Sequence, residues 1–353
     1  MQLQLHYENF IDLLYNKTQE IYMAEFISSF ITGFQDIVEK DLAEKLKGCK
    51  ILNVFDGLIH YKYEGDSRNL EKIIYFNNTF FVLKTMKGKG ISFPSLVGAV
   101  ASEKKYYLIN KGSFRVRFSR ENQFEKVDKN LVRRAEETVV QNSKLKIDRL
   151  SPSTEIWYSI RSEGFGFCGQ LISKREFTEK NLNKGELRPE LAYLICSFAE
   201  PDENMVVLEP FCGYGSIPVQ MAKKFRFSRL LVSDLDDEKI AMVSQKKQLQ
   251  QENISVCCMD AMKLSNVEAG SVDLVITDPP WGYYEEISDI GEFYKEMFES
   301  FRRVLKKDGK MVVLSARVEE LKKITAEQKV EIENSLHTLI NGKKASLFKL
   351  KFI

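Results

Sequence analysis

Residues 271–282, SVDLVITDPPWG, decide the fold of this chain. The apolar run at 274–277 predicts a buried strand. That strand continues directly into the tetrad Asp278-Pro279-Pro280-Trp281. Because proline lacks a backbone N–H and restricts the residue before it, the two prolines end the strand in a stiff, extended turn. A carboxylate, a rigid carbonyl and a large aromatic ring are therefore expected at the carboxyl end of a strand, where open α/β sheets bind ligands.

These three groups suit the alkylation of an exocyclic amine on a nucleobase. Asp278 and the carbonyl of Pro279 can each accept one N–H of the amine, which orients its nitrogen. Trp281 offers a face for an extruded base, and such stacking contributes about 1–3 kcal/mol. Taken alone, the tetrad would be better explained as a strand end with a Pro-Pro turn and a core tryptophan. The rest of the chain favours the chemical interpretation.

Strand and helix patterns alternate from residue 204 to the end of the chain, which predicts a parallel sheet with helices on both faces. The tetrad follows the fourth strand of this series. The helix expected from Phe293 ends near Gly309. The last segment, residues 337–352, predicts a hairpin that turns at Asn341-Gly342 and adds an antiparallel edge.

A glycine-rich turn, EPFCGYGS at residues 209–216, follows the first strand of the series. Gly213 and Gly215 allow a tight turn and a close approach to a ligand. The third glycine of a dinucleotide fingerprint is missing, and so is the lysine of a P-loop. Glu209, placed just before the glycines, suits a ligand with a positive ammonium group.

Two further acids end the next two strands. Asp234 lies about twenty residues after the glycine turn, where an acid can accept both ribose hydroxyls. Asp260 can accept the amine of adenine. Each acid alone is more often a helix N-cap or a surface residue, and we assign that capping role to Asp236. An ammonium, a ribose and an adenine together describe S-adenosylmethionine.

The first half of the chain has a different pattern. Residues 25–86 predict a β-α-β-β-α-β order, which indicates a small ferredoxin-like module, after a helical lead at residues 1–20. The next segment begins loosely around Gly88, Gly90 and Pro94. It then predicts a strand, an amphipathic helix and two or three more strands at residues 113–120, 126–143 and 146–173. Trp157 and Tyr158 are assigned to packing.

Positive charge is concentrated in one segment. Residues 84–150 hold sixteen Lys and Arg against seven Asp and Glu, a net +9, so the rest of a chain of net charge +2 carries −7. This asymmetry suggests a surface for a polyanion such as a nucleic acid. Solvated faces of a Lys-rich protein explain the charge equally well.

The composition argues against several other classes of protein. The six cysteines and three histidines show no metal-ligand spacing, so we expect reduced thiols and no metal site. No run reaches transmembrane length and the N-terminus is not that of a signal peptide, which predicts a cytoplasmic protein without membrane contact. We also expect a monomer.

The motifs EPFCGYGS, SDLD, CMDA and TDPPWG resemble those of class I S-adenosylmethionine-dependent amino-methyltransferases. KGELRPELAYLI at 184–195, FRVRFSR and the basic helix after it resemble THUMP-domain RNA methyltransferases. The likeness implies a Rossmann-like methyltransferase sheet with a C-terminal antiparallel hairpin, preceded by an α+β region. It implies three domains: a ferredoxin-like module at 1–86, a THUMP-like RNA-binding domain at 87–183 and a methyltransferase domain at 184–353.

The resemblance also implies roles for individual residues. The catalytic residues would be Asp278, Pro279, Pro280 and Trp281. The residues holding S-adenosylmethionine would be Arg188, Glu209, Phe211, Gly213, Gly215, Ser216, Asp234, Asp260 and Ala261. The reaction would be methylation of the N2 amine of a guanosine in tRNA, in the acceptor stem or nearby. Glu209, Ser216 and Trp281 depart from the commoner Asp, Thr and Tyr or Phe, and the last leaves the target base open.

Other functions fit parts of this pattern. Adenine N6 methylation in RNA or DNA uses the same kind of tetrad, and the basic segment favours structured RNA without deciding the base. A non-catalytic RNA-binding protein would have no use for Asp234, Asp260 and Asp278. A protein-glutamine methyltransferase would leave the basic segment unexplained.

Overall fold

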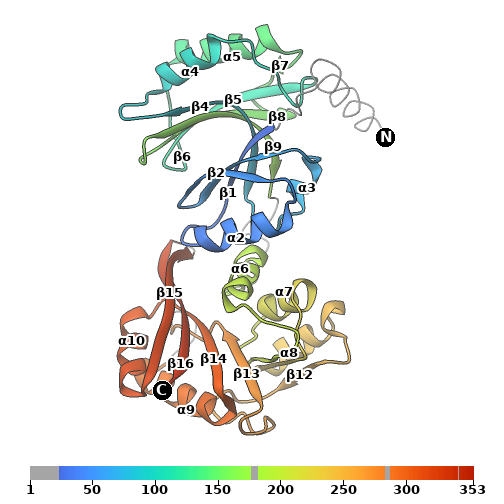
Figure 1. Ribbon diagram of the computed structural model, residues 1–353, viewed down its shortest axis with the longest axis vertical. Helices are drawn as coiled ribbons and strands as arrows, with labels where there is room; N and C mark the ends of the chain where they lie inside the picture. Colours follow the sequence, from blue (N-terminus) through green and yellow to red (C-terminus); the bar gives the residue numbers. More distant parts are fainter. Residues whose placement is uncertain (1–23, 176–181, 283–286, 341) are drawn as a thin grey trace. The chain divides into compact units, whose positions relative to one another are not determined.

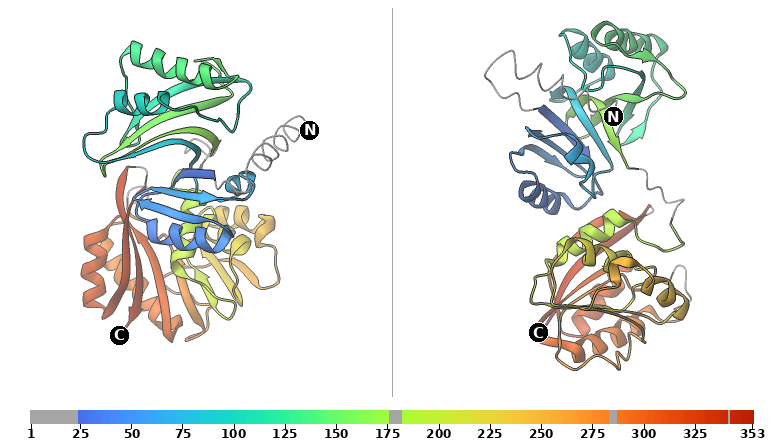
Figure 2. Two further views of the ribbon diagram at one scale, coloured as in Figure 1. Left: turned by 45° about the horizontal axis from the view of Figure 1, so that its top comes forward. Right: turned by 90° about the vertical axis from the view of Figure 1, so that its right-hand side faces the viewer.

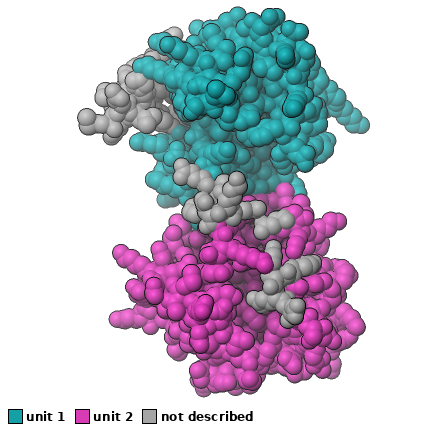
Figure 3. All heavy atoms as spheres, turned by 180° about the vertical axis from the view of Figure 1, so that it is seen from behind, with its two compact units in different colours: residues 1–30, 39–175 teal, residues 31–38, 176–353 magenta. Residues whose placement is uncertain are grey.

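The computed structural model describes residues 24–175, 182–282, 287–340 and 342–353. The chain divides into two compact units, one of residues 1–30 and 39–175 and one of residues 31–38 and 176–353 (Figure 3). The helical lead expected at residues 1–20 lies outside the described residues. The three domain limits expected from the sequence stay predictions.

The N-terminal half combines a curved sheet with short helices (Figure 1). Its strands are β1 (Ala24–Ser29), β2 (Lys50–Phe55), β3 (Leu58–Tyr63), β4 (Asn78–Lys87), β5 (Ser113–Arg120), β6 (Gln123–Phe124), β7 (Lys146–Ile147), β8 (Thr154–Arg161) and β9 (Phe165–Lys174). Its helices are α2 (Gln35–Lys45), α3 (Arg68–Glu71), α4 (Phe93–Ala101) and α5 (Lys129–Asn142).

One sheet runs through this half in the order β2-β3-β1-β4-β9-β8-β5-β6, with β7 beside β5. The elements from β1 to β4 follow the β-α-β-β-α-β order predicted from the sequence. Strand β4 joins β9 in antiparallel register, so the two predicted N-terminal modules share a single sheet.

Helix α4 is a correction to the sequence analysis, which expected a loose segment here. Ser92 caps the helix: its Oγ accepts a hydrogen bond from the Ser95 backbone N–H, and the Oγ of Ser95 accepts one from the Ser92 backbone N–H. Pro94 occupies the first turn, where its missing N–H costs nothing. Four apolar side chains of α4 are buried in the same core as α5.

The C-terminal half alternates strands and helices, as predicted (Figure 1). Its strands are β10 (Val206–Glu209), β11 (Arg229–Asp234), β12 (Ile254–Cys258), β13 (Val272–Thr277), β14 (Leu305–Ser315), β15 (Val330–Ile340) and β16 (Lys343–Phe352). Its helices are α6 (Pro189–Ala199), α7 (Ser216–Lys224), α8 (Asp237–Ser244), the 3₁₀ turn η2 (Lys247–Leu249), α9 (Ile290–Val304) and α10 (Val318–Glu327).

The second sheet has the order β12-β11-β10-β13-β14-β16-β15. Strands β10 to β14 are all parallel. Strands β11 and β12 are added on one side of β10, and β13 and β14 are added on its other side. Ligands bind at such a switch point, beyond the carboxyl ends of the strands. The predicted hairpin is present, although its first strand begins at Val330 and Asn341 of the predicted turn lies outside the described residues. Strand β16 inserts between β14 and β15 and is antiparallel to both.

Helices cover both faces of this sheet (Figures 1 and 2). In β14, Met311 and Val313 pack against the cluster formed by α9 and α10. Val312 and Leu314 point the other way and are also fully buried. Helix α9 ends at Val304, earlier than the predicted end near Gly309, because Leu305 pairs with Val272 and begins β14.

Two further properties bear on function. The described helices include none that is long and apolar enough to cross a membrane. All six cysteines are free thiols, and no group of three potential metal-binding side chains occurs among the described residues.

Candidate functional site

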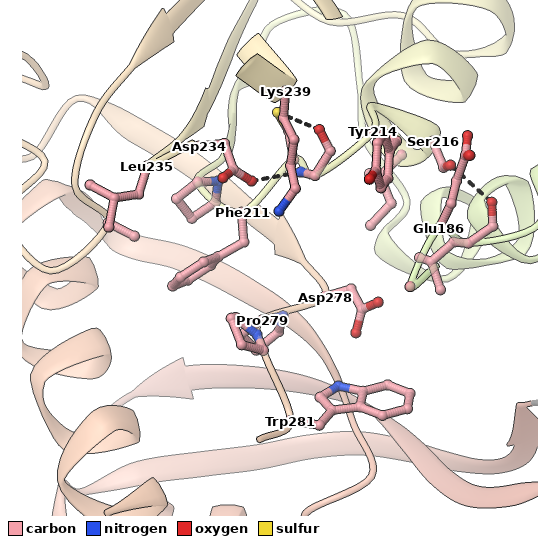
Figure 4. Close-up of a pocket in the computed structure, with 18 of the residues that line it drawn as sticks. Glu186, Phe211, Tyr214, Ser216, Asp234, Leu235, Lys239, Asp278, Pro279 and Trp281 are labelled. Carbon is pink, nitrogen blue, oxygen red and sulfur yellow. Dashed lines mark hydrogen bonds between the residues drawn. The ribbon is translucent and has the colours of Figure 1, made fainter. Parts of the chain in front are cut away.

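A cavity of about 430 Å³ lies in the C-terminal unit, at the carboxyl ends of β10, β11, β12 and β13 (Figure 4). Ten of the site residues expected from the sequence line it. They are Phe211, Gly213, Ser216, Asp234, Asp260, Ala261, Asp278, Pro279, Pro280 and Trp281. The fold therefore brings together side chains from four strand ends that are far apart in sequence.

The glycine turn forms one wall of this cavity. Gly213 has a φ of +50°, and a Cβ built on it would meet no atom within 4 Å. The backbone here is thus open to whatever the cavity holds. The N–H of Gly213 donates a 2.7 Å hydrogen bond to Oδ2 of Asp234, which fixes the carboxylate against the turn (Figure 4).

Asp234 also accepts a hydrogen bond from the backbone N–H of Asp236, at 3.1 Å from Oδ1. Each of its oxygens has a second lone pair, so the carboxylate can still accept bonds from a ligand. Asp236 caps α8 by accepting the N–H groups of Glu238 and Lys239, as the sequence analysis assigned.

Asp260 and Ala261 lie at the end of β12. Oδ1 of Asp260 accepts the N–H of Met262 at 2.9 Å, and Oδ2 pairs with Lys263 at 3.0 Å. Burial disfavours the Asp260 carboxylate, but these two partners outweigh it and hold the pKa of Asp260 below its ordinary value. The carbonyl of Ala261 accepts a hydrogen bond from Ser300.

Ser216 begins α7, and its Oγ donates a 2.9 Å hydrogen bond to the carbonyl of Leu187 (Figure 4). Gly215 precedes it as the N-cap, with a φ of +82°. Gly215 does not line the cavity. A Cβ on it would lie 3.2 Å from Val243, so its role in the structure is close packing of the turn.

Glu209 is fully buried at the end of β10 and does not line the cavity. Its Oε1 accepts the N–H of Phe211 at 3.1 Å and the hydroxyl of Thr277 at 2.8 Å, which ties the end of β10 to that of β13. Oε2 has no hydrogen-bond partner among the described residues. Burial raises the pKa of Glu209 well above its ordinary value.

Asp278 is the carboxylate of the DPPW turn. The residue is half-buried, and its Oδ1 is buried without a hydrogen-bond partner of ordinary geometry among the described residues. Burial raises the pKa of Asp278 to about 8, and the neighbouring indole N–H of Trp281 opposes this shift only in part. Figure 4 shows the carboxyl group and the indole facing the same space.

The turn is anchored from outside the cavity. Nε of Arg317 donates a 2.8 Å hydrogen bond to the carbonyl of Trp281. The N–H of Arg317 donates to Oγ of Ser315, which in turn bonds the hydroxyl of Tyr294 at 2.8 Å. The orientation of the turn therefore depends on β14 and α9 as well as on its own prolines.

Arg188 was expected near the cofactor, but it does not line the cavity. It precedes α6, and its Nη1 lies 3.7 Å from Oε1 of the buried Glu190. The preceding residues 184–187 line the cavity instead. Its role in binding stays a prediction.

Sequence reasoning missed several lining residues. Leu235 follows Asp234 and is 70% exposed, which is unusual for a leucine and places an apolar side chain at the cavity. Lys239, on the first turn of α8, extends into the cavity near Tyr214 (Figure 4). Met262 and Phe293 add further apolar surface. Leu235 could have been predicted from the sequence, because it directly follows the strand-end acid Asp234.

The C-terminal half of the chain is similar in sequence to known methyltransferases. Residues 175–344 match the family model described as RMKL-like, methyltransferase domain. The probable tRNA (guanine(10)-N2)-dimethyltransferase of Methanothermococcus thermolithotrophicus is 32% identical over 136 residues, which are 36% of this chain and 80% of that protein. The U6 snRNA (guanine-N(2))-methyltransferase THUMPD2 of Bos taurus is 28% identical over 172 residues, 48% of this chain. The chain spans only about a third of the length of that relative (33%).

Among solved structures, TrmN from Thermus thermophilus superposes with a TM-score of 0.75 at 19% sequence identity. The match covers 94% of this chain and 100% of that one. The likeness therefore extends through the N-terminal half as well as the half that holds the cavity, and it shows that the two chains share a fold.

Proposed function

Because the chain belongs to the RMKL-like methyltransferase family, we propose that it transfers the methyl group of S-adenosylmethionine to the exocyclic N2 amine of a guanosine in RNA, with tRNA as the substrate class. The curated relatives named above act on guanine N2, in tRNA or in U6 snRNA. The basic segment of the N-terminal half supports an RNA partner. A monomeric state and a cytoplasmic location stay predictions.

The cavity fits the cofactor. Its volume of about 430 Å³ lies in the range of small-molecule sites, and the open backbone at Gly213 leaves room for close approach. Asp234 would hold the ribose, and Asp260 with Leu235 and Ala261 would hold the adenine. Glu209 would not contact the cofactor directly; it would hold the backbone of the glycine turn in place through its hydrogen bond with the N–H of Phe211. The bound cofactor would supply an electrophilic methyl group.

The DPPW turn would hold the nucleophile. An exocyclic amine has two N–H groups, and Asp278 together with the Pro279 carbonyl would accept them. Trp281 would stack on the extruded base. The fixed turn, supported by Arg317, would keep the amine in line with the methyl group, and such positioning supplies most of the rate in a direct transfer. Asp278 would take the surplus proton from the methylated nitrogen.

One observation supports this proposal most strongly: a buried carboxyl oxygen without a hydrogen-bond partner of ordinary geometry among the described residues faces the cavity beside a tryptophan. A buried polar atom of this kind costs free energy unless a ligand satisfies it. An N–H of the target amine would do so.

The test is incubation of the protein with total tRNA and methyl-labelled cofactor, followed by nucleoside analysis. We expect N2-methylguanosine from the wild type. The Asp278→Ala variant should lose at least about 100-fold in turnover, the scale of a lost proton acceptor, while cofactor affinity stays nearly unchanged. Asp308→Ala, which alters an exposed acid far along the chain from the turn, serves as the control.

Two results would contradict the proposal. Near-wild-type turnover by Asp278→Ala would remove the role of the carboxylate. Label appearing as N6-methyladenosine would assign the site to the other base with an exocyclic amine.

A further inference from the structure

A second cavity, of about 270 Å³, lies within the N-terminal unit. It opens on the face of the sheet that points away from α4 and α5. In β5 the side chains of Phe114 and Phe118 pack with those helices, so Ser119 projects to the opposite face. In β8 the same alternation directs Trp157, Ser159 and Arg161 to this face.

The polar groups of this cavity are largely unused. Ser119 and Ser159 are register partners on β5 and β8, both buried, and neither hydroxyl has a hydrogen bond to another described residue. The side-chain amides of Asn77 and Asn78, which also line the cavity, have no hydrogen bond within the described part of the chain either. Two hydroxyls and two amides are therefore free to bind a ligand with several donors and acceptors.

A buried arginine supports the wall. Arg161 is 8% exposed, and its Nη atoms donate to Oδ1 of Asn122 at 3.1 Å, to the carbonyl of Asp56 at 2.7 Å and to the carboxylate of Glu163 at 2.8 Å. Its Nε is buried with no hydrogen-bond partner among the described residues. Asn122 has a φ of +63°, so the β5–β6 turn adopts a left-handed conformation while it holds this arginine.

Aromatic rings form the other side. Trp157 packs on Phe80 with ring centroids 5.2 Å apart, and Phe124 meets it edge-on at 4.9 Å. Phe124 is nevertheless 59% exposed, which is rare for a phenylalanine, and the guanidinium of Arg117 lies 4.7 Å from its ring centroid. The cavity therefore combines an exposed aromatic surface and an arginine with inward hydroxyls and amides.

We propose that this cavity binds the base of an unpaired nucleotide in the RNA substrate. A nucleobase offers an apolar face for stacking and an edge of donors and acceptors, which are the two kinds of surface present here. The inference rests on the proposed function, because it names a second contact of the same RNA. It places that contact on the face opposite α5, the basic helix that the charge pattern had pointed to.

The chain offers a direct probe, because it contains only two tryptophans, Trp157 and Trp281. In the Trp281→Phe variant all tryptophan fluorescence comes from Trp157 at this cavity. Titration with the four nucleoside 5′-monophosphates and with single-stranded oligonucleotides should quench or shift this emission with saturation. Ribose 5-phosphate and inorganic phosphate should leave it unchanged.

Three variants in this background locate the contact. Asn78→Ala and Ser159→Ala should each weaken nucleotide binding by about fivefold or more, the scale of a lost hydrogen bond, and Phe124→Ala by about tenfold, the scale of lost stacking. Neither Asn78 nor Ser159 makes a side-chain hydrogen bond to another described residue, so their melting temperatures should stay close to the parent. Asn130→Ala, the same change on the exposed surface of α5, is the matched control.

The outcomes separate this proposal from the proposed function. A saturable Trp157 response that weakens in the cavity variants but not in Asn130→Ala supports the base site, whether or not the protein methylates guanosine. No response to any nucleotide or oligonucleotide, an equal response to inorganic phosphate, or unchanged affinity in the cavity variants would overturn it, even if methylation of tRNA were observed. Adding Asp278→Asn should abolish turnover and leave the Trp157 titration unchanged.

Discussion

Asp278 concentrates the chemistry of this protein in one side chain. It is the only residue of the DPPW turn that can change its charge, and it lies at the end of a strand whose other residues are almost all buried. The same burial that makes the carboxyl group a strong hydrogen-bond acceptor also raises its pKa to about 8. Activity and stability should therefore both depend on the protonation of this group.

The first consequence is a pH dependence of catalysis. Only the ionised carboxylate accepts an N–H on either oxygen and takes up a proton. With a pKa of about 8 in the free protein, kcat/KM should rise roughly tenfold per pH unit below pH 8 and level off above it. Initial rates across pH 6 to 9 at subsaturating RNA would check this. A flat profile would mean that Asp278 is already ionised at pH 6.

The second consequence concerns stability. The folded protein keeps the Asp278 proton up to about pH 8, whereas the unfolded chain loses it at about pH 4. Between these values the folded state binds more protons, so this group lowers the free energy of unfolding as pH rises. Asp278→Asn lacks the effect. Its melting temperature should exceed that of wild type more at pH 8.5 than at pH 5, with Asp308→Asn as the control; an equal difference at both pH values would contradict the raised pKa.

At the scale of elements, the turn between β10 and α7 joins two glycines with different tasks. Gly213 has open space where a Cβ would be, while Gly215 lies against Val243. Both have positive φ angles, so any other residue costs about 1–2 kcal/mol in backbone strain. Alanine substitutions can therefore distinguish the two positions, because the added methyl group would meet open space at Gly213 and the side chain of Val243 at Gly215.

We expect Gly213→Ala to weaken cofactor binding by about tenfold or more, because the added methyl group occupies the open side of the turn, while stability falls only by the backbone strain. Gly215→Ala should lose more stability, since its Cβ would lie 3.2 Å from Val243. Calorimetric binding of the cofactor and urea denaturation would measure the two effects. The reverse order of stabilities would show that the backbone at Gly213 is the more constrained.

At the scale of the whole molecule, the C-terminal unit recruits residues from early in the chain. Residues 31–38 cluster with it, and Oγ1 of Thr338 donates a 2.8 Å hydrogen bond to the carbonyl of Thr32. Gly33 lies so close to the carbonyl of His337 that a Cβ would overlap it. Strand β15, at the edge of the sheet, is thus covered by a segment far away in sequence.

A fragment of residues 176–353 should therefore be less stable than the same unit in the intact chain. It lacks residues 31–38 and leaves an edge strand uncovered, which favours association between copies. Thermal unfolding and size-exclusion chromatography of the fragment would measure both effects. A fragment that stays monomeric and has the same melting temperature as the intact chain would show that these contacts contribute little to stability.

Local sequence determined a large part of the structure. The alternation of apolar and polar residues located most strands and helices, and the capping role assigned to Asp236 marked the start of α8. One prediction was wrong because residues far apart in sequence determine where an element ends. Helix α9 stops at Val304 because Leu305 pairs with Val272 on β13. Helix α4 was missed because its capping box uses Ser95, where a Glu or Gln is the usual signal.

The sequence by itself determined which chemical groups the site contains, because strand-end acids, glycines and the DPPW turn are local features that do not depend on the rest of the fold. Tertiary structure alone decided which of them face the cavity. It buried Glu209, turned Arg188 toward Glu190, and brought Lys239 to the cavity, where no local pattern placed it. The direction of a side chain and the pKa of a carboxyl group depend on packing between strands far apart in the chain, and that packing cannot be read from any one segment.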